Sequence, residues 1–372
     1  MECYLDNAAT TSISKAAHAA MRKAMSYGNA SSEHRLGHLA KDAMEEARGI
    51  IAAKIGARPC EVIFTSGGSE SNSMALNLMR NLPQKNLVIS AIEHNSIRKY
   101  AKELEANGIV IHEIPVDKDG MILMKVFMES LDPHVGMVSI IHGNNEVGTI
   151  QDINLLGKIC KDKGIILHID ACQSFCKAPI DLTYVDMMSI CSHKIHGPLG
   201  AGALFVREGV DIGPIICGEQ ENGKRGGTQN VPAIAGMACA AQEYTPKEIL
   251  RVSNLRKKMA SKLLSGIPTM EINGPANGLP TILSVRFPGV EAETMLAHLN
   301  LKKIYASAGA ACDSKSKESS HVLSAIGKSR IASQETIRLS FGRQHTLSEI
   351  EYAADKIIES HSNLLRISKR IR

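Results

Sequence analysis

Two stretches, GIILHIDACQS (residues 164–174) and MMSICSHKIHGPLGAGALFV (residues 187–206), decide the fold that we expect for this chain. They contain short apolar runs bounded by turn residues, which is typical of buried strands. The first run ends in Asp170, and the second ends at His193 and Lys194. A His-Gly-Pro turn then leads to a third run, GALFV. The stretches therefore predict three buried strands, two of which end in ionisable side chains.

The same alternation of short strands and longer helices extends upstream to residue 62. The earlier strand candidates are VIFTS, NLVIS, IVIHEI and GMVSIIH. The helix candidates are residues 34–55, 70–80, 96–106 and 153–163, and Gly56 follows the first of them at the usual stop position. Alternating strands and helices predict an α/β fold with a mostly parallel seven-stranded sheet covered by helices.

The 372 residues are too many for one ordinary hydrophobic core, which predicts two domains. After about residue 243 the pattern changes to a charged helix (246–264), strand candidates at 281–285 and 336–341, and a final helix from Leu347. We expect residues 12–245 to form a large domain. Residues 1–11 and 246–372 are expected to form a smaller α+β domain packed against it.

Composition excludes several classes of protein. Hydrophobic residues make up 44% and charged residues 22% of the chain, as in ordinary globular proteins. The longest stretch without charge, 226–242, is interrupted by polar residues, and the start MECYLDNAATT has no secretory signal, so we expect a cytoplasmic protein without a membrane segment. A dispersed charge of +5, 3% aromatic residues and no tryptophan argue against a nucleic-acid partner.

Nine cysteines without a C-x-x-C pair do not form the framework of a stapled secreted domain, so most are expected to be reduced. Four of them lie in or beside apolar runs, and we interpret them as small buried hydrophobes: Cys60, Cys160, Cys191 and Cys239. Cys312 differs, because the segment 306–320, ASAGAACDSKSKESS, predicts an exposed loop. The residues alone leave open whether this thiol is a reactive group or an oxidation liability.

Several candidate site residues occur at strand ends, where open α/β sheets bind ligands. VIFTS leads into Gly67-Gly68-Ser69-Glu70, a helix start that suits a phosphate but is also typical of a simple capped helix. Asp170, with Gln173 one turn later, closes one strand, and Lys194 closes another. Taken singly, Lys194 is typical of a solvated loop lysine, and His94 is typical of a helix cap.

Taken together, these residues match what pyridoxal phosphate requires of a protein. The cofactor needs an anion site for its phosphate, a carboxylate for its pyridine nitrogen, a lysine for its aldehyde and a flat partner for its ring. A lysine in a crevice can lose its proton through desolvation, and the neutral amine reacts with aldehydes. The histidine and cysteine spacings match no familiar zinc pattern, so no metal site is expected.

At these residues the chain resembles the NifS/IscS-like cysteine desulfurases, which are class V aminotransferases with PLP fold type I. The similarity extends over nearly the whole chain, through YLDNAATT, FTSGGSESN, EHNS, NNEVGTIQD, HIDACQS, SHKIHGPLGAGAL, KRGGTQN, SAGAAC and IRLSFGR. It implies conversion of L-cysteine to L-alanine, with a persulfide on Cys312. It also implies a homodimer and an acceptor protein for the sulfur, either an iron–sulfur scaffold or a tRNA-thiolation protein.

The resemblance implies a role for each matching catalytic residue. Lys194 would hold the cofactor and later move protons at the substrate α-carbon, and Cys312 would take the sulfur. Asp170 would keep the pyridine nitrogen protonated, and Gln173 would hydrogen-bond the ring hydroxyl. His94 would stack on the ring and assist proton transfer.

The resemblance also implies binding roles for a second set of residues. Those that would surround the phosphate are Gly68, Ser69, Cys191, His193 and, from a second subunit, Thr228. Asn145 and Arg338 would hold the substrate carboxylate, which suits the planar fork of arginine.

Three positions depart from the family's pattern. Cys191 stands where a phosphate-binding serine is usual, so a weaker thiol contact replaces a hydroxyl hydrogen bond. Asn222 and Gly226 replace residues that are commonly Arg and Ser or Ala in a dimer-contacting segment. The short segment after the last helix leaves the docking of partner proteins open.

Two alternative functions stay open at this point. A selenocysteine lyase shares the implied fold, the cofactor and a similar cysteine loop. A weakly active sulfur carrier would act through binding alone, although the presence of Lys194, Asp170, His94 and Cys312 together argues against it. The sulfur acceptor and any need for an accessory protein are not predicted.

Overall fold

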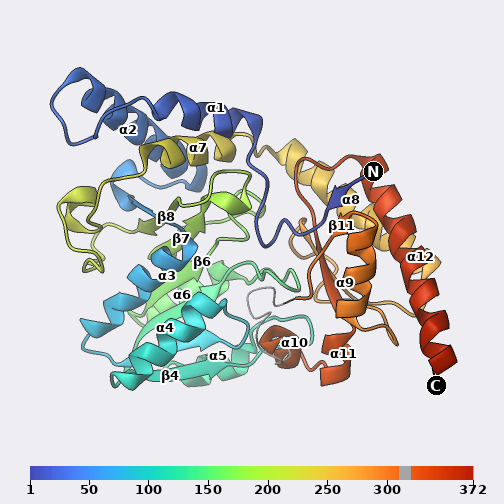
Figure 1. Ribbon diagram of the computed structural model, residues 1–372. Coiled ribbons are helices and arrows are strands. Elements are labelled where there is room, and N and C mark those ends of the chain that lie inside the picture. Colours follow the sequence, from blue (N-terminus) through green and yellow to red (C-terminus); the bar gives the residue numbers. More distant parts are fainter. Residues whose placement is uncertain (310–319, 372) are drawn as a thin grey trace.

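The computed structural model describes residues 1–309 and 320–371. Its centre is a seven-stranded sheet with the order β2-β8-β7-β6-β5-β3-β4 (Figure 1). The strands are β2 Val62–Thr65, β3 Asn86–Ser90, β4 Val110–Ile114, β5 Val135–Ile141, β6 Ile166–Asp170, β7 Met187–Cys191 and β8 Gly202–Val206. Strands β3 to β7 run parallel, whereas β8 is antiparallel to both neighbours. The predicted α/β fold with a mostly parallel seven-stranded sheet is confirmed.

Helices cover both faces of this sheet because successive strand residues point to opposite sides. Phe64 and Met188 lie in one apolar cluster, and their neighbours Ile63 and Met187 lie in another. The first cluster includes residues of α1 (Lys15–Ala24), α2 (Arg35–Ile55), α5 (Met124–Ser130), α6 (Ile153–Asp162) and α7 (Val231–Gln242). The second includes residues of α3 (Gly68–Asn77) and α4 (Asn95–Ala106). The sheet is therefore buried on both faces, as expected of parallel strands.

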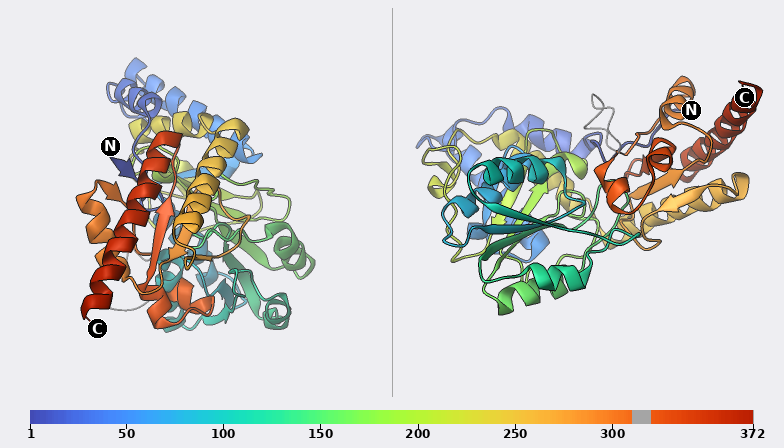
Figure 2. Two further views of the ribbon diagram at one scale, coloured as in Figure 1. Left: turned by 90° about the vertical axis from the view of Figure 1, so that its right-hand side faces the viewer. Right: turned by 90° about the horizontal axis from the view of Figure 1, so that it is seen from below.

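A further apolar core lies at the other end of the molecule, where Figure 2 shows the orange and red helices beside one another. Its sheet is antiparallel, with β9 (Glu271–Asn273), β10 (Ile282–Arg286) and β12 (Thr336–Ser340). The helices of this core are α8 (Pro246–Gly266), α9 (Ala292–Leu301) and α12 (Leu347–Ile371). The N-terminal strand β1 (Cys3–Tyr4) joins the same core through its pairing with β11 (Ile304–Tyr305). The exact domain boundaries stay a prediction.

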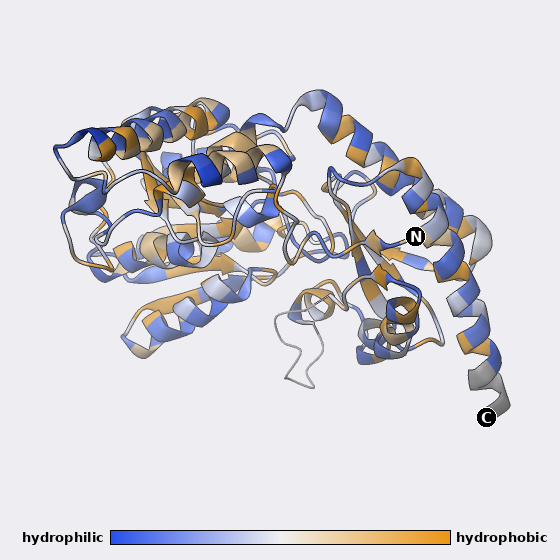
Figure 3. Cartoon of the chain, turned by 45° about the horizontal axis from the view of Figure 1, so that its top comes forward, coloured by the Kyte–Doolittle hydropathy of each residue, from blue (hydrophilic) through white to orange (hydrophobic). Residues whose placement is uncertain are grey.

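Short elements connect these parts. They are the 3-10 helices η1 (Pro59–Glu61), η2 (Leu78–Arg80), η3 (Ser192–Lys194) and η4 (Gln220–Gly223), with the helices α10 (His321–Ala325) and α11 (Arg330–Gln334). Figure 3 shows mostly apolar central strands, while the helices mix apolar and polar residues. Within residues 1–309 and 320–371, the search for a helix with the length and apolar character of a membrane span finds none.

Some local predictions are wrong. Cys60 is exposed because it lies in η1, on the turn that precedes β2, and Cys239 on α7 is only partly buried. Cys160 and Cys191 are buried, as predicted. Helix α3 begins at Gly68, two residues before the predicted start, so the glycine turn itself forms the first turn of the helix.

Candidate active site

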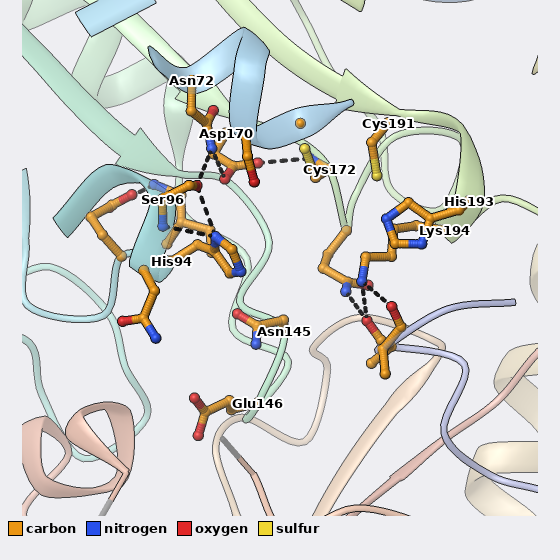
Figure 4. Close-up of a pocket in the computed structure, with 18 of the residues that line it drawn as sticks. Asn72, His94, Ser96, Asn145, Glu146, Asp170, Cys172, Cys191, His193 and Lys194 are labelled. Atoms are coloured by element: carbon orange, nitrogen blue, oxygen red, sulfur yellow. Dashed lines mark hydrogen bonds between the residues drawn. The ribbon is translucent and has the colours of Figure 1, made fainter. Parts of the chain in front are cut away.

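A cavity of about 350 Å³ lies at the carboxyl ends of β6 and β7 (Figure 4). The N-terminal segment, the starts of α3 and α4, and the loop after β5 complete its wall. It brings together ten of the residues predicted from the sequence: Gly68, Ser69, His94, Asn145, Asp170, Gln173, Cys191, His193, Lys194 and Arg338. The strand ends therefore gather the candidate side chains where an open α/β sheet is expected to bind a ligand.

Lys194 is the last residue of η3, which follows directly after β7. Its Nζ donates to the carbonyl oxygens of Ala8 and Ala9, at 2.6 and 2.5 Å. The N-terminal segment is fixed next to η3, because Thr11 donates to the carbonyl oxygen of His193 through both its backbone N–H and its hydroxyl. The amine is therefore anchored in the cavity by backbone acceptors.

Asp170 ends β6 and is 3% exposed. Its Oδ2 accepts a hydrogen bond of 2.8 Å from Asn72 Nδ2, and its Oδ1 accepts one of 2.9 Å from the Cys172 backbone N–H. Asn72 is itself oriented by a 2.9 Å hydrogen bond from Nδ2 to Ser96 Oγ. A buried carboxylate with donors on both oxygens is well suited to hold a positively charged N–H of a ligand.

Gln173 presents an amide group to the cavity. Its Nε2 donates to the carbonyl oxygen of Ala8 at 2.8 Å, and its buried Oε1 has no hydrogen-bond partner within residues 1–309 and 320–371. The buried Oδ1 of Asn72 also lacks a partner among these residues. Because buried polar groups in folded proteins are nearly always paired, these two oxygens indicate places for ligand donors.

His94 is the N-cap of α4, the structural role considered for it from the sequence. Its Nδ1 accepts a 3.1 Å hydrogen bond from the Ser96 backbone N–H and lies 2.8 Å from Ser96 Oγ. An accepting Nδ1 places the proton of the neutral ring on Nε2. The cap therefore fixes the ring, and the ring lines the cavity.

The first turn of α3 forms the anion-binding end of the cavity. Gly68 and Ser69 provide backbone N–H groups at a helix N-terminus, where the helix dipole favours negative charge. A Cβ atom on Gly68 would lie 2.3 Å from Cys172 Sγ, so any larger residue would force the Cys172 side chain to move. His193 lies on the same cavity, with its Nδ1 3.1 Å from Thr10 Oγ1.

Cys191 and Cys172 are neighbours on the wall of this anion-binding end. A hydrogen bond from the Cys172 thiol, with help from His193 and the Lys194 charge, lowers the pKa of Cys191. The same hydrogen bond, together with burial, raises the pKa of Cys172. The departure from serine therefore places an unusually acidic thiol where the family has a hydroxyl.

Arg338 comes from the middle of β12 and is 2% exposed. Its Nη2 donates to Asp6 Oδ1 at 2.9 Å, and its Nη1 donates to the carbonyl oxygens of Asn145 at 3.0 Å and Gly309 at 3.3 Å. Its buried Nε has no hydrogen-bond partner in the part of the chain that the structure describes. The guanidinium is thus rigidly held beside Asn145, at the side of the cavity formed by the second core.

One predicted residue in the described part of the chain does not line this cavity. Thr228 lines a separate hollow with Ser66, Gly200 and Arg225, which leaves its predicted role in a second subunit untested. Cys312 lies outside the described residues.

The structure explains two of the departures from the family pattern. A Cβ atom on Gly226 would lie 2.2 Å from the Cys217 carbonyl oxygen, so this chain requires glycine there. Asn222 adopts a φ of 56°, in the left-handed region that asparagine tolerates better than most residues.

Sequence reasoning missed several residues that line the cavity, among them Asn72, Cys172 and Glu146. Glu146 accepts a 2.5 Å hydrogen bond from Ser320 Oγ, and a Cβ atom on Gly309 would lie 2.7 Å from its Oε2. Asn72 lies within the FTSGGSESN segment and Glu146 within NNEVGTIQD, so the motifs contained both signals. Their side chains could be assigned a place only once the helices were positioned.

Burial shifts the pKa values of several ionisable groups near the cavity in the direction that disfavours their charged forms. Burial raises the pKa of Glu93 to about 8 and lowers that of Lys177 to about 8. Burial also lowers the pKa of His168, beneath Asp170, to about 4. Among the described residues, no group of three His, Cys, Asp or Glu side chains could hold a metal ion.

Comparison with known proteins agrees with this geometry. Residues 3–353 match the family Aminotransferase class-V. The chain is 39% identical to a cysteine desulfurase IscS of Dictyoglomus turgidum, over 96% of this chain and 95% of that relative. It is 38% identical to a cysteine desulfurase IscS of Klebsiella pneumoniae, over 98% of this chain and 94% of that relative.

Solved structures give the same result. A NifS-like protein superimposes with a TM-score of 0.90 at 34% identity, covering 98% of this chain and all of the other. A NifS-like protein from Rickettsia africae superimposes with a TM-score of 0.85 at 30% identity, covering 98% of this chain and 99% of the other. The chain therefore belongs to the aminotransferase class-V family and, within it, to the NifS/IscS-like cysteine desulfurases.

Proposed function

We propose that this protein is a pyridoxal-phosphate-dependent cysteine desulfurase, which converts L-cysteine to L-alanine and takes the sulfur as a persulfide on Cys312. The observation that carries the proposal is the placement of Lys194, Asp170 and Gln173 around one cavity in a chain of this family. Each supplies one of the groups that the cofactor requires of a protein.

The residues of the cavity fit pyridoxal phosphate. The start of α3 offers N–H groups to the phosphate, and the unpaired Oε1 of Gln173 can accept the ring hydroxyl. Asp170 is buried and oriented to hold a proton on the ring nitrogen. When bound, the cofactor withdraws electrons from the substrate α-carbon.

Lys194 would both attach the cofactor and move the α-proton. Its Nζ lies beside the backbone carbonyl oxygens of Ala8 and Ala9. These oxygens would accept hydrogen bonds from the amine once the substrate has replaced it on the cofactor. His94 would stack on the ring and assist proton transfer, while its Nδ1 serves the α4 cap. General acid and base groups at such positions contribute about 10²- to 10⁴-fold to a rate.

Arg338 would bind the substrate carboxylate beside Asn145. We expect Arg338→Ala to raise KM for cysteine about tenfold to a hundredfold, because hydrogen bonds to charged groups contribute about 1.5–3 kcal/mol. Steady-state alanine formation measures this effect. Asp6→Asn is the matched control, since it removes the ion pair and keeps the guanidinium. An unaltered KM in Arg338→Ala would show that the carboxylate is bound elsewhere.

Cys312 would accept the sulfur atom. We expect Cys312→Ala to reduce cysteine-dependent persulfide formation to background while it keeps the yellow colour of bound cofactor, because the cavity residues are unchanged. Thiol-specific labelling and mass spectrometry measure the persulfide. Cys217→Ser, which alters an exposed cysteine, should behave like the parent protein. Unchanged sulfide release from Cys312→Ala would remove this residue from the mechanism.

The proposal as a whole is tested by reduction and product analysis. Borohydride treatment of the yellow protein should fix the cofactor on Lys194, as located by peptide mass mapping. Incubation with L-cysteine should produce alanine. A protein that takes up no pyridoxal phosphate contradicts the proposed function, and activity on selenocysteine with none on cysteine identifies a selenocysteine lyase instead.

The proposed function also includes an oligomeric state and an acceptor for the sulfur. We propose a cytoplasmic homodimer in which Thr228 approaches the cofactor phosphate of the second subunit. Thr228 lines a separate hollow together with Arg225 and does not line the cavity of its own chain, which supports this arrangement. The sulfur acceptor would be an iron–sulfur scaffold or a tRNA-thiolation protein.

A further inference from the structure

Cys172 and Cys191 line the cavity and have no catalytic task in the proposed reaction. Cys191 is the last residue of β7, and Cys172 lies two residues after the end of β6. These strands are parallel neighbours in which Asp170 pairs with Ser189. Cys172 lies two residues after Asp170, and Cys191 lies two residues after Ser189. The two side chains therefore lie next to each other at the ends of the strands.

Contacts place the two sulfur atoms at the anion-binding end of the cavity. Cys172 Sγ donates to the carbonyl oxygen of Ser189 at 3.8 Å, and Ser189 lies two residues before Cys191 on β7. A Cβ atom on Gly68 would lie 2.3 Å from Cys172 Sγ and 3.5 Å from Cys191 Cβ. Both cysteines thus contact the first turn of α3, and Figure 4 shows them on the wall of the cavity that also carries Lys194.

We propose that Cys172 and Cys191 form an oxidisable thiol pair at the phosphate end of the cavity, and that their disulfide weakens binding of the cofactor. The second half of this proposal rests on the proposed function. In the loaded protein, Cys191 would be protonated and would donate its S–H to the phosphate in place of the family's serine, whereas a disulfide has no S–H donor. Loss of one hydrogen bond to a charged group corresponds to about tenfold to a hundredfold weaker binding.

The oxidation can proceed with hydrogen peroxide as the two-electron oxidant. The Cys191 thiolate attacks one peroxide oxygen, the O–O bond breaks, and the departing hydroxide leaves as water after taking a proton. The Cys172 sulfur then attacks the oxidised Cys191 sulfur, the S–S bond forms, and a second water leaves with the Cys172 proton. A small dithiol reverses the change by thiol–disulfide exchange.

The reactivity of this pair contrasts with that of the core cysteines. Burial raises the pKa of Cys3, Cys160 and Cys176 to about 12, which keeps them as unreactive thiols. The pKa of Cys191 is lowered by the hydrogen bond from Cys172. Because the thiolate is the form that reacts with peroxide, oxidation should begin at Cys191.

Binding and oxidation are linked reciprocally. If the disulfide weakens cofactor binding by some factor, bound cofactor must oppose disulfide formation by the same factor. The protein without cofactor should therefore be oxidised at this pair, and the loaded protein should be protected.

The test uses full-length Cys312→Ala protein, so that the loop thiol does not react. Reduced protein with and without added pyridoxal phosphate is exposed to hydrogen peroxide, remaining thiols are alkylated, and peptides are mapped by mass spectrometry. We expect a peptide pair linked through Cys172 and Cys191 in the cofactor-free sample and much less of it in the loaded sample. Absence of the link in folded, cofactor-free protein would overturn the proposal.

Variants and binding measurements separate this inference from the proposed function. Cys172→Ala and Cys191→Ser should each abolish the link, whereas Cys217→Ser should retain it. Titration of oxidised and reduced protein with pyridoxal phosphate should give dissociation constants about ten- to a hundredfold apart, and dithiothreitol should restore the tighter value. Cys172→Ala should give the same constant under both conditions. If the disulfide is mapped but the oxidised and reduced proteins have equal dissociation constants, the proposed effect on cofactor binding is wrong. If the reduced protein does not bind pyridoxal phosphate, the proposed function is wrong.

Discussion

Lys194→Ala is expected to lower the rate of alanine formation at least about 10³-fold, because positioned proton transfer alone contributes about 10²- to 10⁴-fold and covalent attachment is lost as well. The variant should still take up pyridoxal phosphate, since the start of α3, Asp170 and Gln173 remain in place. It should release the cofactor on gel filtration, and borohydride should attach none of it to the protein. Stopped-time alanine assays and absorbance spectra measure the two effects.

Two further variants make this test specific to the amine. Lys194→Arg keeps the positive charge but cannot supply a neutral amine, because the guanidinium stays protonated, so it should be as inactive as Lys194→Ala. Lys118→Ala removes a lysine with an 84% exposed side chain and should act like the parent protein. Activity of Lys194→Ala close to that of Lys118→Ala would contradict the assigned role of the amine.

The sequence was sufficient to predict the large sheet because most of its strands are predominantly apolar runs. A strand covered on both faces, such as β5 with every residue buried, has this pattern in any parallel sheet. The strand-end residues Asp170 and Lys194 could be predicted for the same reason, since each follows directly after such a run. Element boundaries were less certain, because α3 begins on glycines that usually mark turns.

The contacts that orient the site could not be predicted in the same way. Lys194 is anchored by the backbone carbonyl oxygens of Ala8 and Ala9, and a carbonyl oxygen gives no signal in a residue pattern. Arg338 pairs with Asp6 across 332 positions of the chain, which depends on the N-terminal segment joining the second core. The pairing of Cys172 with Cys191 likewise follows from strand order, since β6 and β7 are neighbours in the sheet.

Asp170→Asn is expected to lower kcat about 10²- to 10³-fold, which lies within the contribution of a positioned acid or base. The substitution keeps the size of the side chain and removes the negative charge that would hold a proton on the cofactor's ring nitrogen. Neighbouring groups cannot replace this charge. The pKa of Glu93 is raised to about 8, so it is mostly protonated at neutral pH, and the pKa of His168 is lowered to about 4, so it is neutral.

The hydrogen bonds of Asp170 allow the loss of charge to be separated from structural damage. In Asp170→Asn, the amide oxygen can still accept from the Cys172 N–H, and the new amide N–H₂ would face Asn72. A flip of the Asn72 amide would then present its unpaired Oδ1 as the acceptor, so the melting temperature should change little. Asp170→Ala removes both hydrogen bonds from a buried site and should lower kcat and the melting temperature together. A kcat for Asp170→Asn equal to that of the parent, with cofactor fully bound, would show that the carboxylate charge has no part in the reaction.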